Sequence, residues 1–442
     1  MKRTLCLILA TCLLFSLISC ASESLETTET VTKESTPPVT EPKTEGPEPE
    51  TVPMICDPLT WDDINAIPIA NASMSTDELR QICVDFMALQ LSFPWQTNKA
   101  QEFGHIAIQT SLDPTAKLEV NAAYGGMPYC HSTWSNLYQV MYFYDSETGV
   151  VDAKAMGDKF TTYMGNHCTS SSFWAWARVS NTNNWDGISL LMESRGAIRL
   201  GDYEIEPTTD YYLTRTDTVV ECDKNGEQRM YRCYALLQKA DGINYNHNAT
   251  GGHVEMATQN AVVKYNPDGT INGEESYCYF QDQNPVRNPA SKAQQADGTP
   301  IAVMSGVEHK YTFKQLYKTG YLPFTLAEFH GLDPVEKGEV SFTLSDRTTL
   351  SVKEFMTGKF EANYAISDVN VTFFDKDGKQ TGAQPYLMAN AKGMRNLTLS
   401  ASVFGPQAIM ARNIPGEGAT MKVDVRISTG EVFTVYQGGI TK

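Results

Sequence analysis

The sequence predicts an α+β fold followed by a smaller β-sandwich. Apolar residues recur at helical spacing early in the globular part, and strand-like segments separated by turns come after them. Helices followed by an antiparallel sheet are typical of the α+β class. From Val335 onwards the apolar residues alternate with a period of two, as in a sandwich of short strands. The 442 residues suffice for two hydrophobic cores.

The N-terminus carries the pattern of a bacterial export signal. Lys2 and Arg3 precede an apolar run that ends with the sequence Leu-Ile-Ser-Cys at residues 17–20. This tetrapeptide resembles the lipobox of bacterial lipoproteins, whose cysteine is diacylated after cleavage. We therefore expect residues 1–20 to be a lipoprotein signal peptide. Cys20 is then expected to anchor the mature protein, outside the cytoplasm, to the bacterial cell membrane.

A polar segment follows at residues 21–53, which consist mainly of Thr, Glu, Pro and Ser. Such a segment buries too little apolar surface to fold, so we expect a disordered tether before the globular part. The whole chain has a formal net charge of −17 and no basic run. This charge balance argues against nucleic acid as a partner.

Helical signals fill the first part of the globular region. Ser75 and Glu78 form a capping box ahead of an apolar stripe, so we expect a helix that ends near residue 93. Two glycines and a proline make residues 123–129 a turn. The apolar patterns of residues 132–144 and 152–164 predict two further helices.

The next helical pattern lies within the stretch 165–180, where Cys168 begins it after the polar residues 165–167. Asn166 or Thr169 can cap this helix, and Cys168 then lies in its first turn. There the unpaired backbone amides and the helix dipole favour a thiolate over a thiol, which makes Cys168 a candidate nucleophile. The alternative is a buried cysteine that acts only as a small hydrophobic residue.

Strand signals dominate the chain after residue 210. His253 begins a strand directly after two glycines, which let a substrate or another backbone approach closely. It is therefore the candidate base for Cys168, and the alternative is an ordinary surface histidine. The expected strands cover residues 211–216, 218–222, 230–237, 254–264 and 276–281, with hairpin turns at residues 225–226 and 266–269.

Neither a metal nor a cofactor is expected. His247, His253 and Cys168 lack the spacing of a zinc motif. Residues 264–275 resemble a calcium loop, but a lysine occupies the first ligand position, so they are read as a hairpin. Seven of the ten cysteines lie beyond residue 20. This odd number leaves at least one thiol free unless two chains pair, and we expect most of the others to be reduced.

The C-terminal sandwich is expected at residues 335–442, after a boundary at residues 332–334. It contains no cysteine and no histidine, so we interpret it as a binding or spacer module. Its strands are marked by alternating apolar residues at 340–344, 369–373, 397–403 and 421–427, with turns at 377–378 and 429–430.

Four short motifs in order resemble the NlpC family of papain-like cell-wall cysteine peptidases. The family has a G-x-P-Y turn, an Asp-Cys-Ser at the start of a helix, a Gly-Asp before a strand, and a His-Val that begins a strand. Here His167 replaces the aspartate and Thr169 replaces the serine. The matching positions are residues 126–129, 167–170, 201–202 and 253–254, so the resemblance spans residues 123 to 283.

The resemblance implies a papain-like cysteine hydrolase domain at residues 54–334 that cleaves an amide bond, with peptidoglycan stem peptides as the substrate. Cys168 would be the nucleophile, with His253 as its base. Gln283 or Asp282 would orient the imidazole. Tyr129 and Gly126 would line the substrate site.

Two other interpretations remain open. A transglutaminase-like cysteine enzyme also has a cysteine at a helix start and a later histidine, but it expects an aspartate on the next strand, where Asp282 lies. A catalytically degenerate, wall-binding lipoprotein is the alternative without enzymatic activity. The sequence leaves open the bond that is cleaved, the ligand of the C-terminal module and the oligomeric state.

Overall fold

The computed structural model describes residues 57–99, 101–102, 117–118, 120, 123–130, 134–156, 164–181, 197–204, 226–247, 251–283, 302–303, 307–387, 393–399 and 412–442. The chain divides into two units, Met1–Glu48 and Pro49–Lys442, and all described residues belong to the second. The expected signal peptide with Cys20, the tether and the strands expected at 211–216 and 218–222 lie outside these ranges. Within them, no helix combines the length and the apolar character needed to cross a bilayer.

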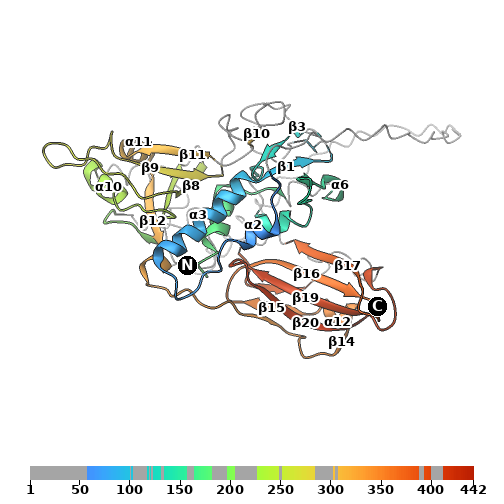
Figure 1. The fold of residues 1–442 in the computed structure, drawn as a ribbon. Coiled ribbons are helices and arrows are strands. Elements are labelled where there is room, and N and C mark those ends of the chain that lie inside the picture. The colour runs from blue at the N-terminus through green and yellow to red at the C-terminus, as the bar shows by residue number, and fades with distance from the viewer. Residues whose placement is uncertain are drawn as a thin grey trace, which may run out of the picture. The chain divides into compact units, whose positions relative to one another are not determined.

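The region before residue 335 combines short helices with strands (Figure 1). Its helices are α2 (Trp61–Asn65), α3 (Thr76–Ser92), α5 (Leu137–Val140), α6 (Ala153–Met156), α8 (Cys168–Trp176), α10 (Glu227–Tyr234), α11 (Phe313–Thr319) and the 3-10 helix η5 (Glu328–His330). Its strands are β1 (Pro94–Thr97), β2 (Gln101–Glu102), β3 (Lys117–Leu118), β4 (Tyr124–Gly125), β5 (Val150–Val151), β6 (Ala197–Arg199), β7 (Gly242–His247), β8 (Gly251–Ala257), β9 (Tyr277–Asp282), β10 (Ala302–Val303), β11 (Val307–Thr312) and β12 (Leu322–Leu326).

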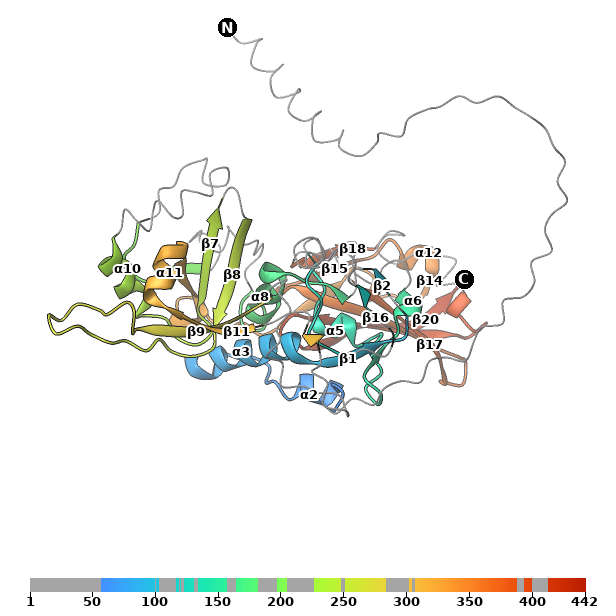
Figure 2. The same ribbon diagram turned by 90° about the horizontal axis from the view of Figure 1, so that it is seen from above.

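A six-stranded sheet of order β11-β9-β8-β7-β12-β6 dominates this region, and its neighbouring strands pair antiparallel. Figure 2 shows β7 and β8 as adjacent arrows, with β9 and β11 beyond them. Within the sheet His253 on β8 faces Tyr245 on β7, and Asp282 on β9 faces Val307 on β11. The smaller sheets are β10-β4-β1-β5 and β2-β3.

Helix α3 confirms the expected capped helix. The Ser75 hydroxyl accepts a hydrogen bond from the Glu78 amide, and the Glu78 carboxylate accepts one from the Ser75 amide at 2.7 Å. The helix ends at its C-cap Phe93, where the sequence predicts its end. Near that end the Gln90 side chain donates to the Ser171 carbonyl at 3.1 Å, which links α3 to α8.

Helix α8 confirms that the cysteine begins a buried helix. All nine of its residues are buried, because both of its apolar faces are covered. The indole N–H groups of its two tryptophans are also hydrogen-bonded: Trp174 donates to the Trp134 carbonyl at 2.9 Å, and Trp176 donates to the Ala240 carbonyl at 2.8 Å. The helix is therefore fixed along its length.

Several expected elements differ from the structure. The strand expected at 230–237 is wrong, because Met230, Cys233 and Tyr234 are the buried side of α10 and follow helical spacing. The long helix expected at 132–144 is reduced to α5, which Asn136 caps. In the part of 152–164 that is described, the regular helix is α6.

The strands predicted around His253 agree more closely with the structure. β8 ends at Ala257, earlier than expected, and β9 matches the strand predicted at 276–281. Residues 264–275 form a hairpin turn in which Tyr265 pairs with Ile271, as expected. The fold class is thus confirmed at its coarser level, a mixture of α and β with few helices and small, largely antiparallel sheets.

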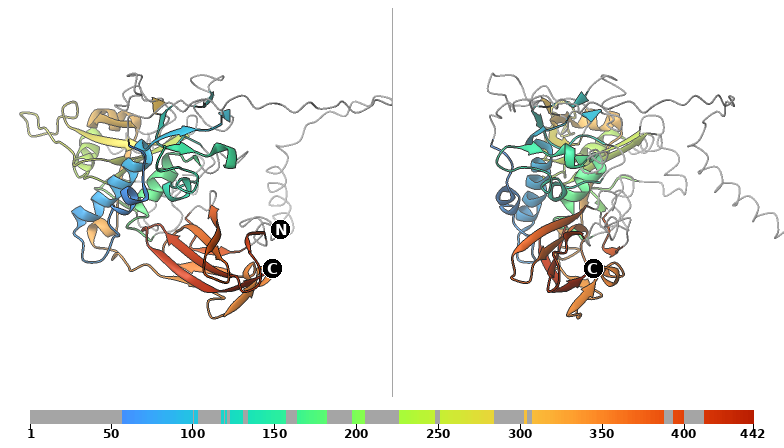
Figure 3. Two further views of the ribbon diagram at one scale, coloured as in Figure 1. Left: turned by 45° about the vertical axis from the view of Figure 1, so that its right-hand side comes forward. Right: turned by 90° about the vertical axis from the view of Figure 1, so that its right-hand side faces the viewer.

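The described part of the C-terminal region, orange to red in Figure 3, contains two sheets and the short helix α12. Buried side chains from both sheets form a single hydrophobic cluster. Val369, Val371 and Phe373 belong to it, as the period-two pattern predicts. The sheets have the orders β13-β15-β18 and β14-β20-β19-β16-β17. The elements are β13 (Val340–Phe342), β14 (Thr349–Ser351), α12 (Val352–Phe355), β15 (Lys359–Ala362), β16 (Ile366–Phe374), β17 (Gln380–Leu387), β18 (Asn396–Thr398), β19 (Thr420–Ile427) and β20 (Val432–Thr441).

Polar contacts join the C-terminal region to the helices of the first region. The Ser367 carbonyl accepts hydrogen bonds from the side chains of Asn136 and Gln139, at 3.2 and 2.9 Å. The Ser428 hydroxyl donates to the Ala177 carbonyl, directly after α8, at 2.7 Å. Nothing in the sequence predicts these contacts, by which the C-terminal region supports α5 and the end of α8.

Gly430 lies in the turn between β19 and β20 and allows this close approach. Its φ is +99°, a conformation that glycine adopts far more readily than other residues. A Cβ atom built on it would collide with the Arg178 guanidinium and would lie 2.9 Å from the Tyr138 hydroxyl.

We expect Gly430→Ala to destabilise the protein by about 2 kcal/mol or more, from backbone strain and overpacking together. Urea unfolding of the wild type and the variant measures the loss. Gly378→Ala is the matched control, because that glycine also has a positive φ but has no atom near the added methyl group. Equal losses for both variants would contradict the packing argument.

Candidate active site

Cys168 is the first residue of α8, as the sequence predicts. The N-cap is His167 rather than Asn166 or Thr169, and its amide donates to the Ser170 hydroxyl at 2.8 Å. The chain leading into the helix is fixed as well, because Asn166 forms a bridge with Tyr129. The cysteine is 6% exposed, so its thiol is held in one place and shielded from bulk water.

His253 approaches Cys168 from β8, which packs against α8, and its imidazole is close enough for its charge to act on the thiol. Burial alone would raise the pKa of Cys168, but the charge of His253 and hydrogen bonds from His167 and His253 hold it well below the usual value. Burial alone would lower the pKa of His253, whereas Asp282 and Cys168 raise it well above its usual value. Both directions favour a thiolate paired with an imidazolium.

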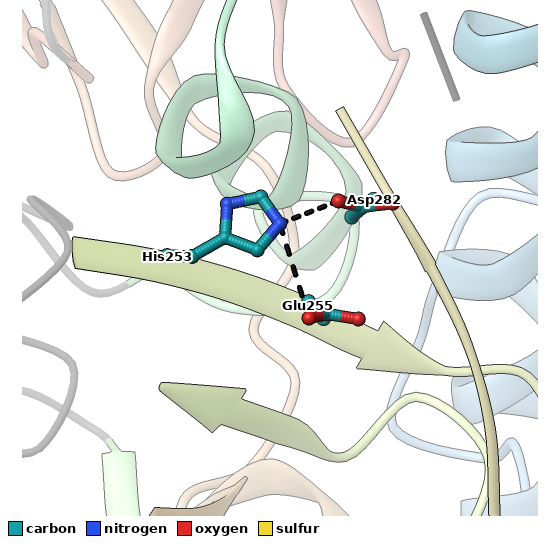
Figure 4. A group of neighbouring side chains, drawn as sticks. All are labelled: His253, Glu255 and Asp282. Atoms are coloured by element: carbon teal, nitrogen blue, oxygen red, sulfur yellow. Dashed lines mark hydrogen bonds and ion pairs between the residues drawn. The ribbon is translucent and has the colours of Figure 1, made fainter. Parts of the chain in front are cut away.

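Asp282, at the end of β9, is the residue that holds the imidazole. Its Oδ2 is hydrogen-bonded to His253 Nε2, and the carboxylate is fully buried (Figure 4). The second ring nitrogen points away from both carboxylates drawn in Figure 4. Since Nε2 serves Asp282, Nδ1 is the nitrogen left for the Cys168 sulfur.

Gln283, the other candidate for orienting the imidazole, is used elsewhere. Its side-chain nitrogen donates to the Met127 carbonyl at 2.6 Å. Gln283 therefore fixes the segment that carries Tyr129, and the structure assigns the contact with His253 to Asp282.

The two predicted substrate-site residues lie on that same segment. Burial, together with the nearby Cys168 sulfur, raises the pKa of the Tyr129 hydroxyl. Gly126 has a φ of +68°, and its carbonyl accepts a hydrogen bond from Trp95 at 2.7 Å. Tyr129 thus lies directly at the candidate nucleophile, while Gly126 shapes the turn before it.

The third motif of the resemblance lies against α10. Gly201 packs on Cys233, and Asp202 forms an ion pair with Arg229 at 3.6 Å. These contacts give residues 201–202 a structural role in the described part of the chain. The motif match at these positions therefore adds nothing to the catalytic geometry.

Four residues at the site were missed in the sequence analysis as functional groups. His167 helps to lower the pKa of Cys168, and Glu255, His309 and Tyr321 form a polar cluster beside Asp282. Glu255 could have been found, because it lies two residues after His253 and therefore on the same face of β8. His309 and Tyr321 come from β11 and from the residue before β12, with no local signal in the sequence.

A metal ion must also be considered at this cluster. Among the described residues, His253, Glu255 and Asp282 offer ligand atoms that all lie within 4.8 Å of one another. These atoms already have protein partners, however: Asp282 holds His253, and Glu255 accepts hydrogen bonds from Tyr321 and His309. The raised pKa of His253 also opposes the neutral ring that a metal needs. We assign no metal here.

The comparisons with known proteins give no family for this chain. No protein-family model, curated protein or solved structure matches it. The chemistry of the site therefore depends on its own geometry.

Two other buried cysteines and one hollow lie apart from the candidate catalytic residues. Cys83 and Cys278 are buried thiols, and burial raises the pKa of Cys278 to about 12. A hollow of about 590 Å³ in the C-terminal region is lined by residues 337–341, 361–363 and Phe433. It contains none of the candidate catalytic residues.

Proposed function

We propose that this protein is a cysteine hydrolase that cleaves an amide bond in peptidoglycan stem peptides, anchored outside the cytoplasm through a lipid on Cys20. One observation carries the enzymatic part: the Cys168 thiol at the start of α8 lies beside His253, whose Nε2 is hydrogen-bonded to Asp282. The substrate and location are supported by the lipobox pattern and by the polar tether that follows it.

The chemistry follows from the protonation of this pair. The Cys168 thiolate attacks the carbonyl carbon, and the first backbone amides of α8, which lack partners within the helix, stabilise the oxyanion. The C–N bond breaks as the His253 imidazolium gives its proton to the leaving amine. Neutral His253 then takes a proton from water, whose oxygen attacks the thioester, and release of the carboxylic acid restores the pair of Cys168 thiolate and His253 imidazolium.

The finer fold assignment belongs to the same proposal. We propose a papain-like arrangement of the NlpC type for residues 54–334, in which a helix with an N-terminal cysteine meets a strand with a histidine. The two C-terminal sheets with their shared hydrophobic cluster support a β-sandwich for residues 335–442. Tyr129 is proposed to contact the substrate, with Gly126 shaping that edge of the site.

A transglutaminase-like enzyme is the second candidate. It is favoured by the contact between His253 and Asp282, because that class expects an aspartate as the third residue. The two candidates differ only in what attacks the thioester, water or an amine. Mass spectrometry of peptidoglycan fragments incubated with a primary amine separates them: new carboxylates indicate hydrolysis, whereas amine adducts indicate transamidation.

Alkylation of Cys168 tests what both candidate functions require, a reactive thiolate at this position. We expect iodoacetamide to modify Cys168 well below pH 8, because His253 and His167 lower its pKa. Peptide mapping by mass spectrometry measures the rate at each pH, and Cys83 and Cys278 in the same sample serve as controls that stay unmodified. A Cys168 that is inert up to pH 8 contradicts the proposal and favours a wall-binding protein without activity.

A further inference from the structure

A second buried polar cluster lies directly beside the proposed catalytic residues. Its centre is Glu255, whose side chain is fully buried. One carboxylate oxygen, Oε2, is hydrogen-bonded to His309 Nε2, and the other, Oε1, accepts a hydrogen bond from the Tyr321 hydroxyl. That same Oε1 lies 3.9 Å from His253 Nε2, the nitrogen that Asp282 holds. Glu255 and Asp282 therefore compete for one imidazole.

His309 lies between the two carboxylates. Its Nε2 contacts Glu255, and its Nδ1 lies 3.8 Å from Asp282 Oδ1. Two buried carboxylates are thus matched by two imidazoles, since burying an unpaired charge costs much free energy. This balance pairs His253 with Asp282 and His309 with Glu255.

The other groups around the cluster come from several elements. Tyr311 and Tyr245 face Glu255 and Asp282, and burial raises the pKa of each hydroxyl, so both stay neutral. On the far side, His253 faces Cys168, which also contacts Tyr129 and His167. Glu255 and His309 are thus the charged groups of the cluster that the proposed reaction does not use.

We propose that Glu255, His309 and Tyr321 form a positioning unit: His309 and Tyr321 bind Glu255 away from His253, so that His253 pairs with Asp282 and Cys168. This inference depends on the proposed function, because it concerns the same cysteine–histidine pair. None of the three residues touches the reacting atoms, and they act through His253.

The unit makes a prediction with a definite sign. Removing His309 leaves the Glu255 carboxylate without its cation, 3.9 Å from His253. The uncompensated negative charge then stabilises the imidazolium and disfavours the thiolate, so the pKa values of both groups rise. Removing the charge of Glu255 has the opposite effect on both. Removing both restores the original balance.

The experiment uses the full chain and the variants His309→Gln, Glu255→Gln and the double variant. The rate of Cys168 alkylation by iodoacetamide is measured against pH, and the His253 ring is titrated by NMR. We expect His309→Gln to move both transitions upward by about one pH unit, and Glu255→Gln to move them downward by a similar amount. The double variant should lie close to the wild type.

Controls and a milder variant keep the test decisive. His330→Gln and Glu308→Gln change the same residue types at exposed positions and should shift neither transition. Tyr321→Phe keeps all charges but frees Oε1, so it should give a smaller upward shift, and it serves if a charge variant does not fold by circular dichroism.

The outcomes separate the two proposals. If Cys168 is unreactive in the wild type, the proposed function fails. If Cys168 reacts but the two single variants shift in the same direction, or not at all, the positioning unit is overturned while the enzyme stands. Stoichiometric divalent metal in the purified protein, lost in Glu255→Gln, would also overturn it.

Discussion

Replacing Cys168 by alanine is expected to lower amide hydrolysis by at least about 10⁴-fold, because the reaction loses its nucleophile and not merely a stabilising contact. Release of new carboxylates from purified peptidoglycan measures the rate. The variant should keep its fold, since alanine suits the start of a helix and removes only one sulfur atom.

Cys83→Ala is the matched control for that variant. Cys83 is fully buried in α3, and burial raises the pKa of its thiol, so its loss should leave the rate within about threefold. A Cys168→Ala protein that still hydrolyses peptidoglycan at the wild-type rate would falsify the assignment of Cys168 as the nucleophile.

Asp282→Asn is expected to lower the turnover number by about 10²- to 10⁴-fold. The asparagine removes the negative charge that raises the pKa of His253, so the imidazolium loses its proton at lower pH. The alkaline limit of the pH–rate profile should therefore move to lower pH. Rates measured from pH 5 to pH 10 on the same peptidoglycan test both effects.

Gln283→Ala serves as the neighbouring control. This change removes the hydrogen bond to the Met127 carbonyl and loosens the Tyr129 segment, so it should raise KM and leave the alkaline limit in place. If Gln283→Ala moved the alkaline limit and Asp282→Asn did not, the roles given to these two residues would have to be exchanged.

The sequence predicts the elements whose signal is local. α3 is marked by its capping box and stripe, β19 by strict alternation, and β16 by alternation from Val369 to Phe373. α10 was missed because its aromatic and β-prone residues resemble a strand, although Met230, Cys233 and Tyr234 recur at helical spacing. The burial of one face of α10 therefore outweighs the strand propensity of its residues.

The candidate site divides in the same way. Cys168 and His253 carry local marks: Cys168 a helix start, and His253 a preceding pair of glycines, which the structure places at the start of β8 rather than before it. The choice between Asp282 and Gln283 could not be made from sequence, because it depends on which side chain turns toward β8. His309 and Tyr321 lie 54 and 66 positions from Glu255, and only the strand order of the sheet brings them together.

The bond from Ser428 to the residue after α8 has a consequence for protein engineering. The helix that carries the nucleophile at one end is attached to the C-terminal sheets at the other. The segment up to residue 334 is therefore a poor candidate for transplanting alone into a fusion enzyme. A chimera that exchanges the C-terminal module must supply a hydroxyl at position 428 and a glycine at position 430. Without them, the end of α8 opposite Cys168 loses its hydrogen bond to the C-terminal sheets.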